Sequence, residues 1–268
     1  MESSAVSVHA LQEGICLLRL QRPARRNALS LPAARALHAA LDEALAAPAL
    51  RVLIITGEGA GFCAGLDLKS LLDADGAYHA TVHEAMELQH VFAGLVQRLR
   101  DTSVTVIAAV NGVAVGAGMA LALAADIRFA AQEASFHVGA VKIGITGGEC
   151  GISYHLPRLI GAGRAFEVML SGRPVAADEA LRIGLVADVT PLADLLERAL
   201  ECARQIVANA PYATAHTKRV MWQNLDAPSL HAAIELENHA QVLGLMTGDF
   251  QEAAQAFAQK RPPVFTGR

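Results

Sequence analysis

The apolar segment Val104 to Ala125 constrains the fold more than any other part of the chain, because it is long enough to suggest a membrane span. Asn111-Gly112 and the Gly-Ala-Gly run at 116–118 interrupt it. Asn-Gly is typical of a turn, and glycine disfavours a continuous helix. The segment therefore predicts a buried strand over Val104–Val110, a turn and a helix over Gly112–Ala125, and no membrane span.

Strands and helices alternate along the first part of the chain. Short apolar runs rich in branched residues predict buried strands, and apolar spacing at three and four residues predicts helices. Such alternation indicates βαβ units with parallel strand pairing. The other predicted strands are Ile15–Leu20, Arg51–Thr56 and Ile127–Ala130, and the other predicted helices are Ala33–Ala46, capped by Ser30, and Leu88–Leu99.

Beyond Asp178 the pattern predicts helices alone. We therefore divide the chain into an α/β core of residues 1–190 and a helical region of residues 191–268. The apolar faces of these helices need a partner surface, either the core or another subunit. The predicted helices are 178–183, 191–209, 211–221, 228–246 and 248–259.

Composition and charge exclude several classes of protein. The chain has 268 residues, of which 53% are apolar and 18% charged, so it can bury a sizeable core. Its formal charge of −4 provides no basic surface for nucleic acid. Four cysteines without a C-x-x-C pair, and an N-terminal segment without a basic and apolar leader, predict a cytoplasmic protein with reduced thiols.

Two glycine-rich loops follow predicted strands. The first, Gly57 to Asp67, begins with Gly-x-Gly, but a dinucleotide-binding fingerprint requires glycine where Phe62 stands. The second, Asn111 to Ala120, lies between a strand and a helix, where backbone N–H groups lack partners. One N–H group from each loop could bind a single ligand oxygen as an oxyanion hole. Alternatively, these glycines only allow close packing of helix against strand.

Four segments in order resemble the crotonase (enoyl-CoA hydratase/isomerase) superfamily: RPARRNALS, GAGFCAGLDLKS, AAVNGVAVGAGMALALAADIRFA and GRPVAADEALRIGLV. The resemblance runs from about residue 13 to the C-terminus. It implies an α/β fold with a crotonase-like ββα spiral core and a C-terminal helical trimerisation region. It also implies an acyl-CoA substrate, a homotrimer or hexamer, and no metal or redox cofactor, since the thioester itself serves as electron sink.

The resemblance also assigns site residues. The two oxyanion donors are the N–H groups of Leu66, which follows Gly65, and of Ala117, which follows Gly116. Lys260 and the adjacent Arg261 could reach a phosphate of coenzyme A, including one bound by a neighbouring subunit. The predicted contacts with coenzyme A are Arg26, Ala28, Ala64, Gly65, Asp67, Leu68, Lys69, Gly116 and Lys260.

The chain departs from the hydratases of this family at both of their catalytic glutamates. One glutamate shortly follows the second oxyanion position, where this chain has Ala120 after Met119. The other stands four residues after a phenylalanine that matches Phe136, and this chain has Ala140 there. Alanine cannot transfer a proton, so classical two-glutamate hydration is not expected.

Glu149 is the remaining candidate for proton transfer. It lies in a glycine-rich loop that resembles the one in which dienoyl-CoA isomerases and an aroyl-CoA dehalogenase of the family carry a working aspartate. A carboxylate against an apolar wall can act as a general base. Alternatively, Glu149 caps the helix that begins near Ile152, because acidic residues favour the first turn of a helix.

Histidines and cysteines provide weaker signals. His79 and His83, with Glu84 and Glu87, could form a metal-binding helix face, but a solvated face explains the segment better. We interpret His137 and His155, which flank the predicted pocket-forming segment that contains Glu149, as packing residues. Neither Cys63 nor Cys150 has a basic neighbour that marks a nucleophile.

The sequence therefore predicts an acyl-CoA-transforming enzyme of the enoyl-CoA hydratase/isomerase type, a lyase or an isomerase. It would isomerise or hydrate a double bond in fatty-acid or related acyl-CoA metabolism. The alternative is a non-catalytic acyl-CoA binding or carrier protein that has lost the two hydratase glutamates. Glu149 distinguishes them, because a carrier has no need of a carboxylate facing the ligand.

Overall fold

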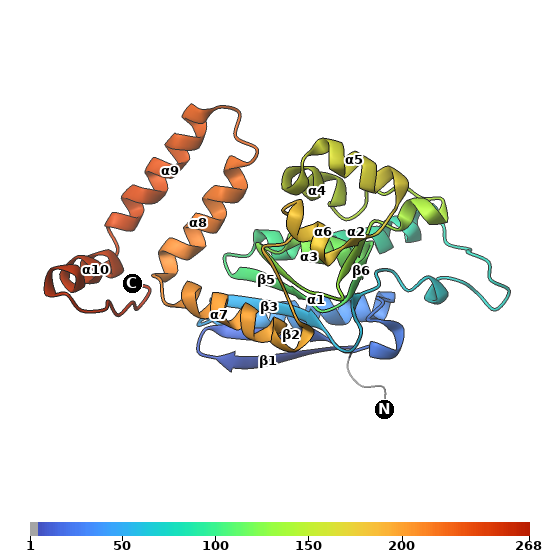
Figure 1. Ribbon diagram of the computed structural model, residues 1–268, viewed down its shortest axis with the longest axis horizontal. Helices are drawn as coiled ribbons and strands as arrows, with labels where there is room; N and C mark the ends of the chain where they lie inside the picture. Colours follow the sequence, from blue (N-terminus) through green and yellow to red (C-terminus); the bar gives the residue numbers. More distant parts are fainter. Residues whose placement is uncertain (1–4) are drawn as a thin grey trace.

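A six-stranded sheet forms the centre of the computed structural model, which describes residues 5–268 (Figure 1). Its strand order is β1-β2-β3-β5-β7-β10; β1 is antiparallel to β2, and all other neighbours are parallel. The parallel pairing expected from the alternating pattern is confirmed. The strands are β1 (Val6–Gln12), β2 (Ile15–Leu20), β3 (Val52–Gly57), β5 (Thr105–Val110), β7 (Ile127–Ala131) and β10 (Asp188–Thr190).

Four very short strands form a second sheet, which was not predicted. They are β4 (Gly61–Cys63), β6 (Val113–Val115), β8 (Ser135–His137) and β9 (Val175–Ala176). Three times the chain passes from a strand of the large sheet to a strand of the small one and then into a helix, which is the ββα spiral. The helix predicted over Gly112–Ala125 is therefore wrong in its first part. That part forms β6, and the helix begins only after Gly116, where φ is +51°.

Helices α1, α2 and α3 cover one face of the large sheet. They bury Leu37, Leu95 and Leu121 against apolar residues of the strands, such as Leu53 and Val106. A fully buried leucine contributes roughly 1.5–3 kcal/mol to stability. The helices up to residue 182 are α1 (Leu31–Leu45), α2 (Val82–Asp101), α3 (Ala117–Ala124), α4 (Ile152–Ile160), α5 (Ala162–Ser171) and α6 (Ala177–Arg182).

Helix α7 (Leu195–Val207) covers the other face of the large sheet. Its Leu195 and Ala199 pack with Ile54, Ile107 and Phe129 from three neighbouring strands. The prediction of helices alone beyond Asp178 is wrong at one place. Strand β10 intervenes there. It pairs in parallel with β7, whose other side already pairs with β5, and so becomes the edge strand of the large sheet.

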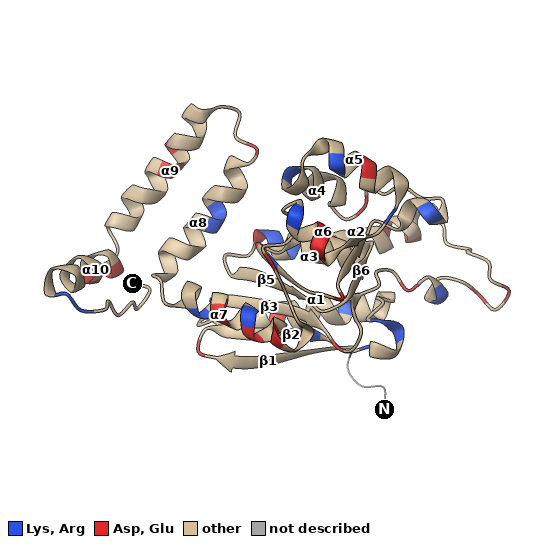
Figure 2. Ribbon diagram, viewed as in Figure 1, with Lys and Arg blue, Asp and Glu red and all other residues tan. Residues whose placement is uncertain are grey.

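A helical arm extends away from the two sheets (Figure 1) and consists of α8 (Pro211–Asn224), α9 (Leu230–Leu245) and α10 (Gly248–Gln259). Helix α9 buries none of its residues, and Figure 2 shows few charged residues along it. Among the helices of residues 5–268, none has the length and apolar character needed to cross a membrane. The exposed apolar side chains of the arm include Leu230, Val242, Leu243, Met246 and Phe257.

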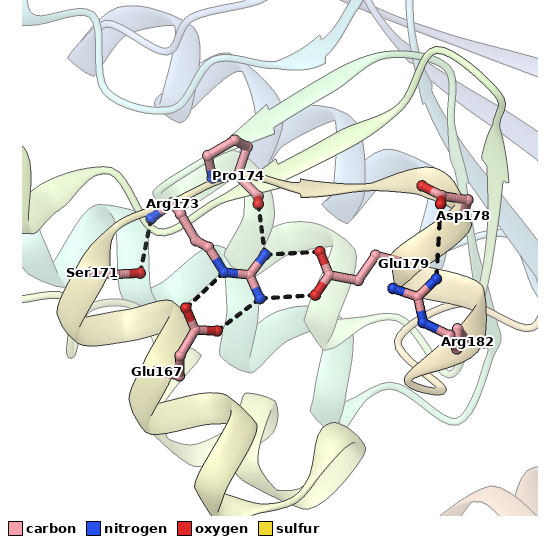
Figure 3. A network of polar contacts seen from close by, with 7 residues as sticks. All are labelled: Glu167, Ser171, Arg173, Pro174, Asp178, Glu179 and Arg182. Atoms are coloured by element: carbon pink, nitrogen blue, oxygen red, sulfur yellow. Dashed lines mark hydrogen bonds and ion pairs between the residues drawn. The ribbon is translucent and has the colours of Figure 1, made fainter.

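One arginine ties α5, β9 and α6 together (Figure 3). Arg173 precedes β9, and its guanidinium donates two hydrogen bonds to Glu167 of α5, both of 2.7 Å. It donates two more to Glu179 of α6, both of 2.8 Å. The hydrogen bonds from Arg173 hold the pKa of each carboxyl below its usual range. The carboxylates of Glu167 and Glu179 thus have a structural role, because Arg173 binds both oxygens of each.

Candidate active site

The two glycine-rich loops meet in backbone contact. A Cβ atom at Gly65 would lie 2.4 Å from the Val115 carbonyl oxygen, and φ at Gly65 is +77°. A Cβ atom at Gly118 would lie 2.0 Å from the Cys63 carbonyl oxygen. Distances this short leave room for glycine only. Small residues therefore bring the loop after β3 directly against the start of α3.

Both predicted donor groups lie at this contact. The Ala117 nitrogen is 3.3 Å from the Cβ position of Gly65, which immediately precedes Leu66. Leu29 bonds to both sides of Leu66, since its N–H donates to Gly65 at 2.7 Å and its carbonyl accepts from Asp67 at 2.9 Å. Within residues 5–268, neither the Leu66 N–H nor the Ala117 N–H has a hydrogen-bond acceptor. Two free donors thus stand on adjoining loops.

Asn27, which the sequence interpretation missed, fixes the first loop against this contact. It is 1% exposed, and its side-chain amide donates to the carbonyls of Glu58 at 3.0 Å and Gly61 at 2.8 Å. Its φ is +57°, a conformation that asparagine tolerates better than most residues. An asparagine within the polar run RPARRNALS is the signal that could have revealed it. The Ala64 N–H then donates to the Arg26 carbonyl at 2.9 Å.

The predicted coenzyme A contacts fall into two groups. Arg26, Leu68 and Lys69 are exposed, and they belong to the same pair of bonded loops as the buried Ala28. Asp67 differs, because it is only 8% exposed and its carboxylate accepts from Arg22 at 3.4 Å. Arg22, which the sequence did not single out, also donates to the Ala28 carbonyl.

Lys260 lies far from the other predicted coenzyme A contacts. It follows α10, which lies at the left end of the view in Figure 1, whereas β6 lies right of the centre. Its backbone is left-handed, with φ of +51°, where the helix ends. Within one chain, Lys260 therefore stands apart from the loops that carry the free N–H groups.

Glu149 lies beside the peptide that carries the second donor. Its Oε1 is 3.0 Å from the Cβ position of Gly116, the residue before Ala117. Within the described chain, the half-buried carboxylate has neither a hydrogen-bond donor nor a cation as partner, and burial raises its pKa to about 7. Helix α4 begins after Gly151 with no side chain capping it, and Ile152 N–H donates to the main-chain carbonyl of Glu149 at 2.8 Å. The geometry therefore does not match a helix cap.

The two positions that the resemblance matches to the hydratase glutamates hold buried alanines. Ala120 is fully buried in the first turn of α3, and Ala140 is 5% exposed just beyond β8. The Gly116 N–H donates to the His137 carbonyl at 2.9 Å, so the ends of β6 and β8 adjoin. Neither Ala120 nor Ala140 has a carboxylate. Glu149, in contrast, places its carboxylate beside Gly116.

The remaining candidates have other surroundings. His137 bonds to Ser135 at 2.9 Å, while His155 is 4% exposed and burial lowers its pKa to about 4. His79 contacts Asp73, and His83 contacts Glu87, on exposed surface. The part of the chain that the structure describes contains no group of three or more potential metal ligands. Burial raises the pKa of Cys63 and of Cys150 to about 12, so neither is a ready thiolate.

Comparison with known proteins identifies the family. Residues 10–268 match the family described as enoyl-CoA hydratase/isomerase. A probable enoyl-CoA hydratase of Mycobacterium tuberculosis is 39% identical over 98% of this chain and 93% of its own. The 1,2-epoxyphenylacetyl-CoA isomerase of Escherichia coli is 33% identical over 96% of this chain and 97% of its own. A crystal structure of a probable enoyl-CoA hydratase/isomerase from Mycobacterium abscessus has a TM-score of 0.90 and 36% identity, covering 99% of this chain and 100% of that one.

The ββα spiral is that of a crotonase fold. The chain belongs to the enoyl-CoA hydratase/isomerase family and is an enzyme of that family. The resemblance seen in four sequence segments is confirmed. Relatives named as a hydratase and as an isomerase match it over nearly its whole length, so membership alone leaves the reaction to the site residues.

Proposed function

We propose that this chain is an acyl-CoA isomerase that shifts a double bond by moving one proton. One observation carries the proposal: Glu149 is the carboxylate beside Gly116, while the two hydratase positions, Ala120 and Ala140, cannot transfer protons. Adding water requires groups that deprotonate water and protonate carbon, whereas a double-bond shift needs one group that removes a proton and returns it. A single carboxylate suits the second reaction.

The thioester oxygen would bind between the N–H groups of Leu66 and Ala117. Each donor would stabilise the developing oxyanion by ~3–4 kcal/mol. Ionised Glu149 would take a proton from one carbon of the enoyl chain, and the electron pair would move into the thioester as an enolate. The protonated acid would then return the proton at a different carbon. A pKa of about 7 lets Glu149 serve as base and then as acid near neutral pH.

Coenzyme A would lie along the two bonded loops, past Arg26, Ala28, Leu68 and Lys69. This scheme needs no metal or redox cofactor, because the thioester carbonyl accepts the electron pair. The position of Glu149 also supports the enzyme over an acyl-CoA carrier. A carrier would leave this carboxylate turned to solvent, which is cheaper than holding it half-buried without a partner.

Replacing Glu149 by glutamine tests the proposal. Glutamine keeps the size of the side chain but cannot transfer a proton, so isomerisation of an enoyl-CoA should fall by ~10²-fold or more while the fold is kept. Turnover is followed by the absorbance of the shifted double bond, and folding by circular dichroism. Glu133→Gln, at an exposed glutamate outside the site, is the matched control and should leave turnover unchanged. Full activity in Glu149→Gln would end the assignment.

We also propose that the arm of α8, α9 and α10 assembles the chain into a homotrimer or a dimer of trimers. The exposed apolar residues of α9, with Leu230 and Leu243 among them, support a subunit contact. In such an assembly Lys260 would approach coenzyme A bound by a neighbour. Light scattering at micromolar concentration should give three or six times the chain mass, and a monomeric mass would contradict the proposal.

A further inference from the structure

Polar contacts fasten α4, the helix that follows Glu149, to the end of α8. Asp226, just beyond α8, accepts hydrogen bonds from the Tyr154 hydroxyl and, at 2.6 Å, from Arg158. The Arg158 guanidinium also lies over the Tyr154 ring, 3.7 Å from its centroid. Because Tyr154 and Arg158 are one turn apart on α4, these contacts hold α4 at its exposed face.

A second contact joins the same two helices on the buried side. The rings of His155 on α4 and Trp222 on α8 meet edge to face, with centroids 6.1 Å apart. His155 is 4% exposed, and within residues 5–268 neither of its ring nitrogens has a hydrogen-bond partner. The His155 ring is therefore buried without a hydrogen bond from its nitrogens. Its contact with Trp222 consists of van der Waals packing between the two rings.

Trp222 is held in place from two sides. Its indole N–H donates to Asp126 at 2.7 Å, and the Arg100 guanidinium lies 2.9 Å from its ring centroid. Asp126 in turn accepts from the buried Lys218 at 2.9 Å and from the Val106 N–H at 2.7 Å. Trp222 is thereby tied to the large sheet through Asp126.

A cleft beside Trp222 explains why this anchoring matters. The cleft has a volume of about 700 Å³ and lies between α8 and the end of α2, and Arg100, Trp222 and Asp226 are among the residues that line it. A side chain that lost its hydrogen bond and its stacked cation would have room to turn into this space. The contact with His155 would then open.

The other side of His155 supports the turn that presents Glu149. A Cβ atom at Gly151 would lie 3.2 Å from His155 Nδ1, so the ring fits directly against this glycine. The turn contains two successive left-handed residues, Cys150 with φ of +44° and Gly151 with φ of +79°. For a residue such as cysteine this conformation persists only where the surroundings impose it.

We propose that Trp222 and His155 are positioning residues, which hold the Glu149–Gly151 turn so that the Glu149 carboxylate stays beside Gly116. The proposal rests on the proposed function, in which Glu149 moves the proton. Movement of α8 would loosen the turn, admit water to the carboxylate and displace it from the substrate. Helix α8 would thus influence the chemistry of its own subunit without touching the acyl-CoA bound there.

Trp222→Ala tests this inference with two measurements on the full-length protein. Its kcat should fall by about tenfold or more, with KM changed less than about threefold, because a displaced base harms the chemical step more than binding. The pKa of Glu149, followed as the infrared carboxyl band that is missing in Glu149→Gln, should fall from about 7 toward its ordinary value of 4.5. Trp222→Phe retains an aromatic face and should recover most of both quantities.

Two further variants keep the test decisive. His155→Ala removes the opposite half of the contact and should reproduce both effects, including when Trp222→Ala does not fold. Gln223→Ala, at an exposed neighbour on α8, should change neither quantity. The variants could instead fold, melt at a lower temperature and keep the kcat and the Glu149 pKa of the parent. Trp222 and His155 would then be packing residues only, and the inference would be wrong. The infrared titration needs no turnover, so it gives its answer even if Glu149→Gln proves active and the proposed function fails.

Discussion

Two sets of glutamates in the α4–α6 region of the molecule have opposite surroundings. Glu167 and Glu179 share the guanidinium of Arg173 (Figure 3), and its hydrogen bonds lower the pKa of each carboxyl. Glu149, on the loop before α4, has no such partner among the described residues, and burial raises its pKa to about 7. The same residue type therefore has a permanent charge at one place and an exchangeable proton at the other.

The difference shows how this fold separates structure from chemistry. Glu167 and Glu179 each accept two charge-assisted hydrogen bonds from Arg173. Such carboxylates stay ionised and hold helices and strands together. A carboxylate left half-buried without a partner is close to balance between its two forms at neutral pH, as a general base must be. Unpaired charge, which would be a defect in a structural cluster, is the property that indicates function at Glu149.

Hydration of a short enoyl-CoA provides the largest expected effect. Because alanines, Ala120 and Ala140, stand where the resemblance places the two hydratase glutamates, the rate should lie about 10²–10⁴-fold below that of a two-glutamate hydratase for each missing group. Crotonyl-CoA hydration, followed by loss of its conjugated absorbance beside a two-glutamate relative as control, measures this. Near-diffusion-limited hydration would show that Glu149 is not the only proton carrier.

The pH dependence of isomerisation gives the next largest effect. A base must be ionised, so kcat/KM should fall about tenfold per pH unit below pH 7 and level off above it, following the Glu149 pKa of about 7. The profile is measured from pH 5 to 9, within the range where the protein stays folded by circular dichroism. Activity that is flat between pH 5 and 7 would place the working group elsewhere.

The smallest effects concern stability, and they should have opposite signs at the two places. The pKa of Glu167 and Glu179 is lowered in the folded state, so their pairing stabilises the fold above their unfolded pKa and is lost in acid. Arg173→Gln should therefore lower the melting temperature by a few degrees at neutral pH but not at acidic pH, with activity within about twofold of the parent.

Glu149→Gln should behave in the reverse way. The folded-state pKa of Glu149 is raised from 4.5 to about 7, so the parent loses stability as pH rises through this interval. The glutamine variant should then match or exceed the parent in melting temperature at pH 8. Scanning calorimetry measures the melting temperatures of the parent and of both variants at pH 4 and pH 8. If the difference between variant and parent changed with pH in the same direction for Arg173→Gln and Glu149→Gln, the contrast between the two sets of glutamates would be removed.

Local sequence patterns predict β2, β3, β5 and β7 of the large sheet, but they predict neither β1 and β10 nor the strands of the small sheet. Runs such as Arg51–Thr56 are long and apolar enough to identify a buried strand, and β3 is found there. The strands of the small sheet span only two or three residues, too few for any periodicity to show. Strand β10 is equally short, and it pairs with a strand about sixty residues earlier in the chain, which no local window can detect.

The candidate site divides in the same way. The sequence points to the loops of Gly65 and Gly118, because glycine is common where two backbones approach closely. The approach of Glu149 to Gly116, by contrast, joins two loops that lie well apart along the chain, so no local pattern reveals it. Asn27 and Arg22 bond to carbonyls and a carboxylate of another loop, so their roles also become visible only in three dimensions.

The position of α7 has a consequence for how the protein is made. Ribosomes deliver the N-terminal part first, so the strands bearing Ile54, Ile107 and Phe129 emerge well before the helix that covers them. Until Leu195–Val207 has left the ribosome, one face of the large sheet remains an open apolar surface. A nascent chain that stalls or is cut before Leu195 keeps that surface exposed, and it is a substrate for chaperones and for aggregation. Folding of α7 onto the sheet thus also ends the vulnerable period of synthesis.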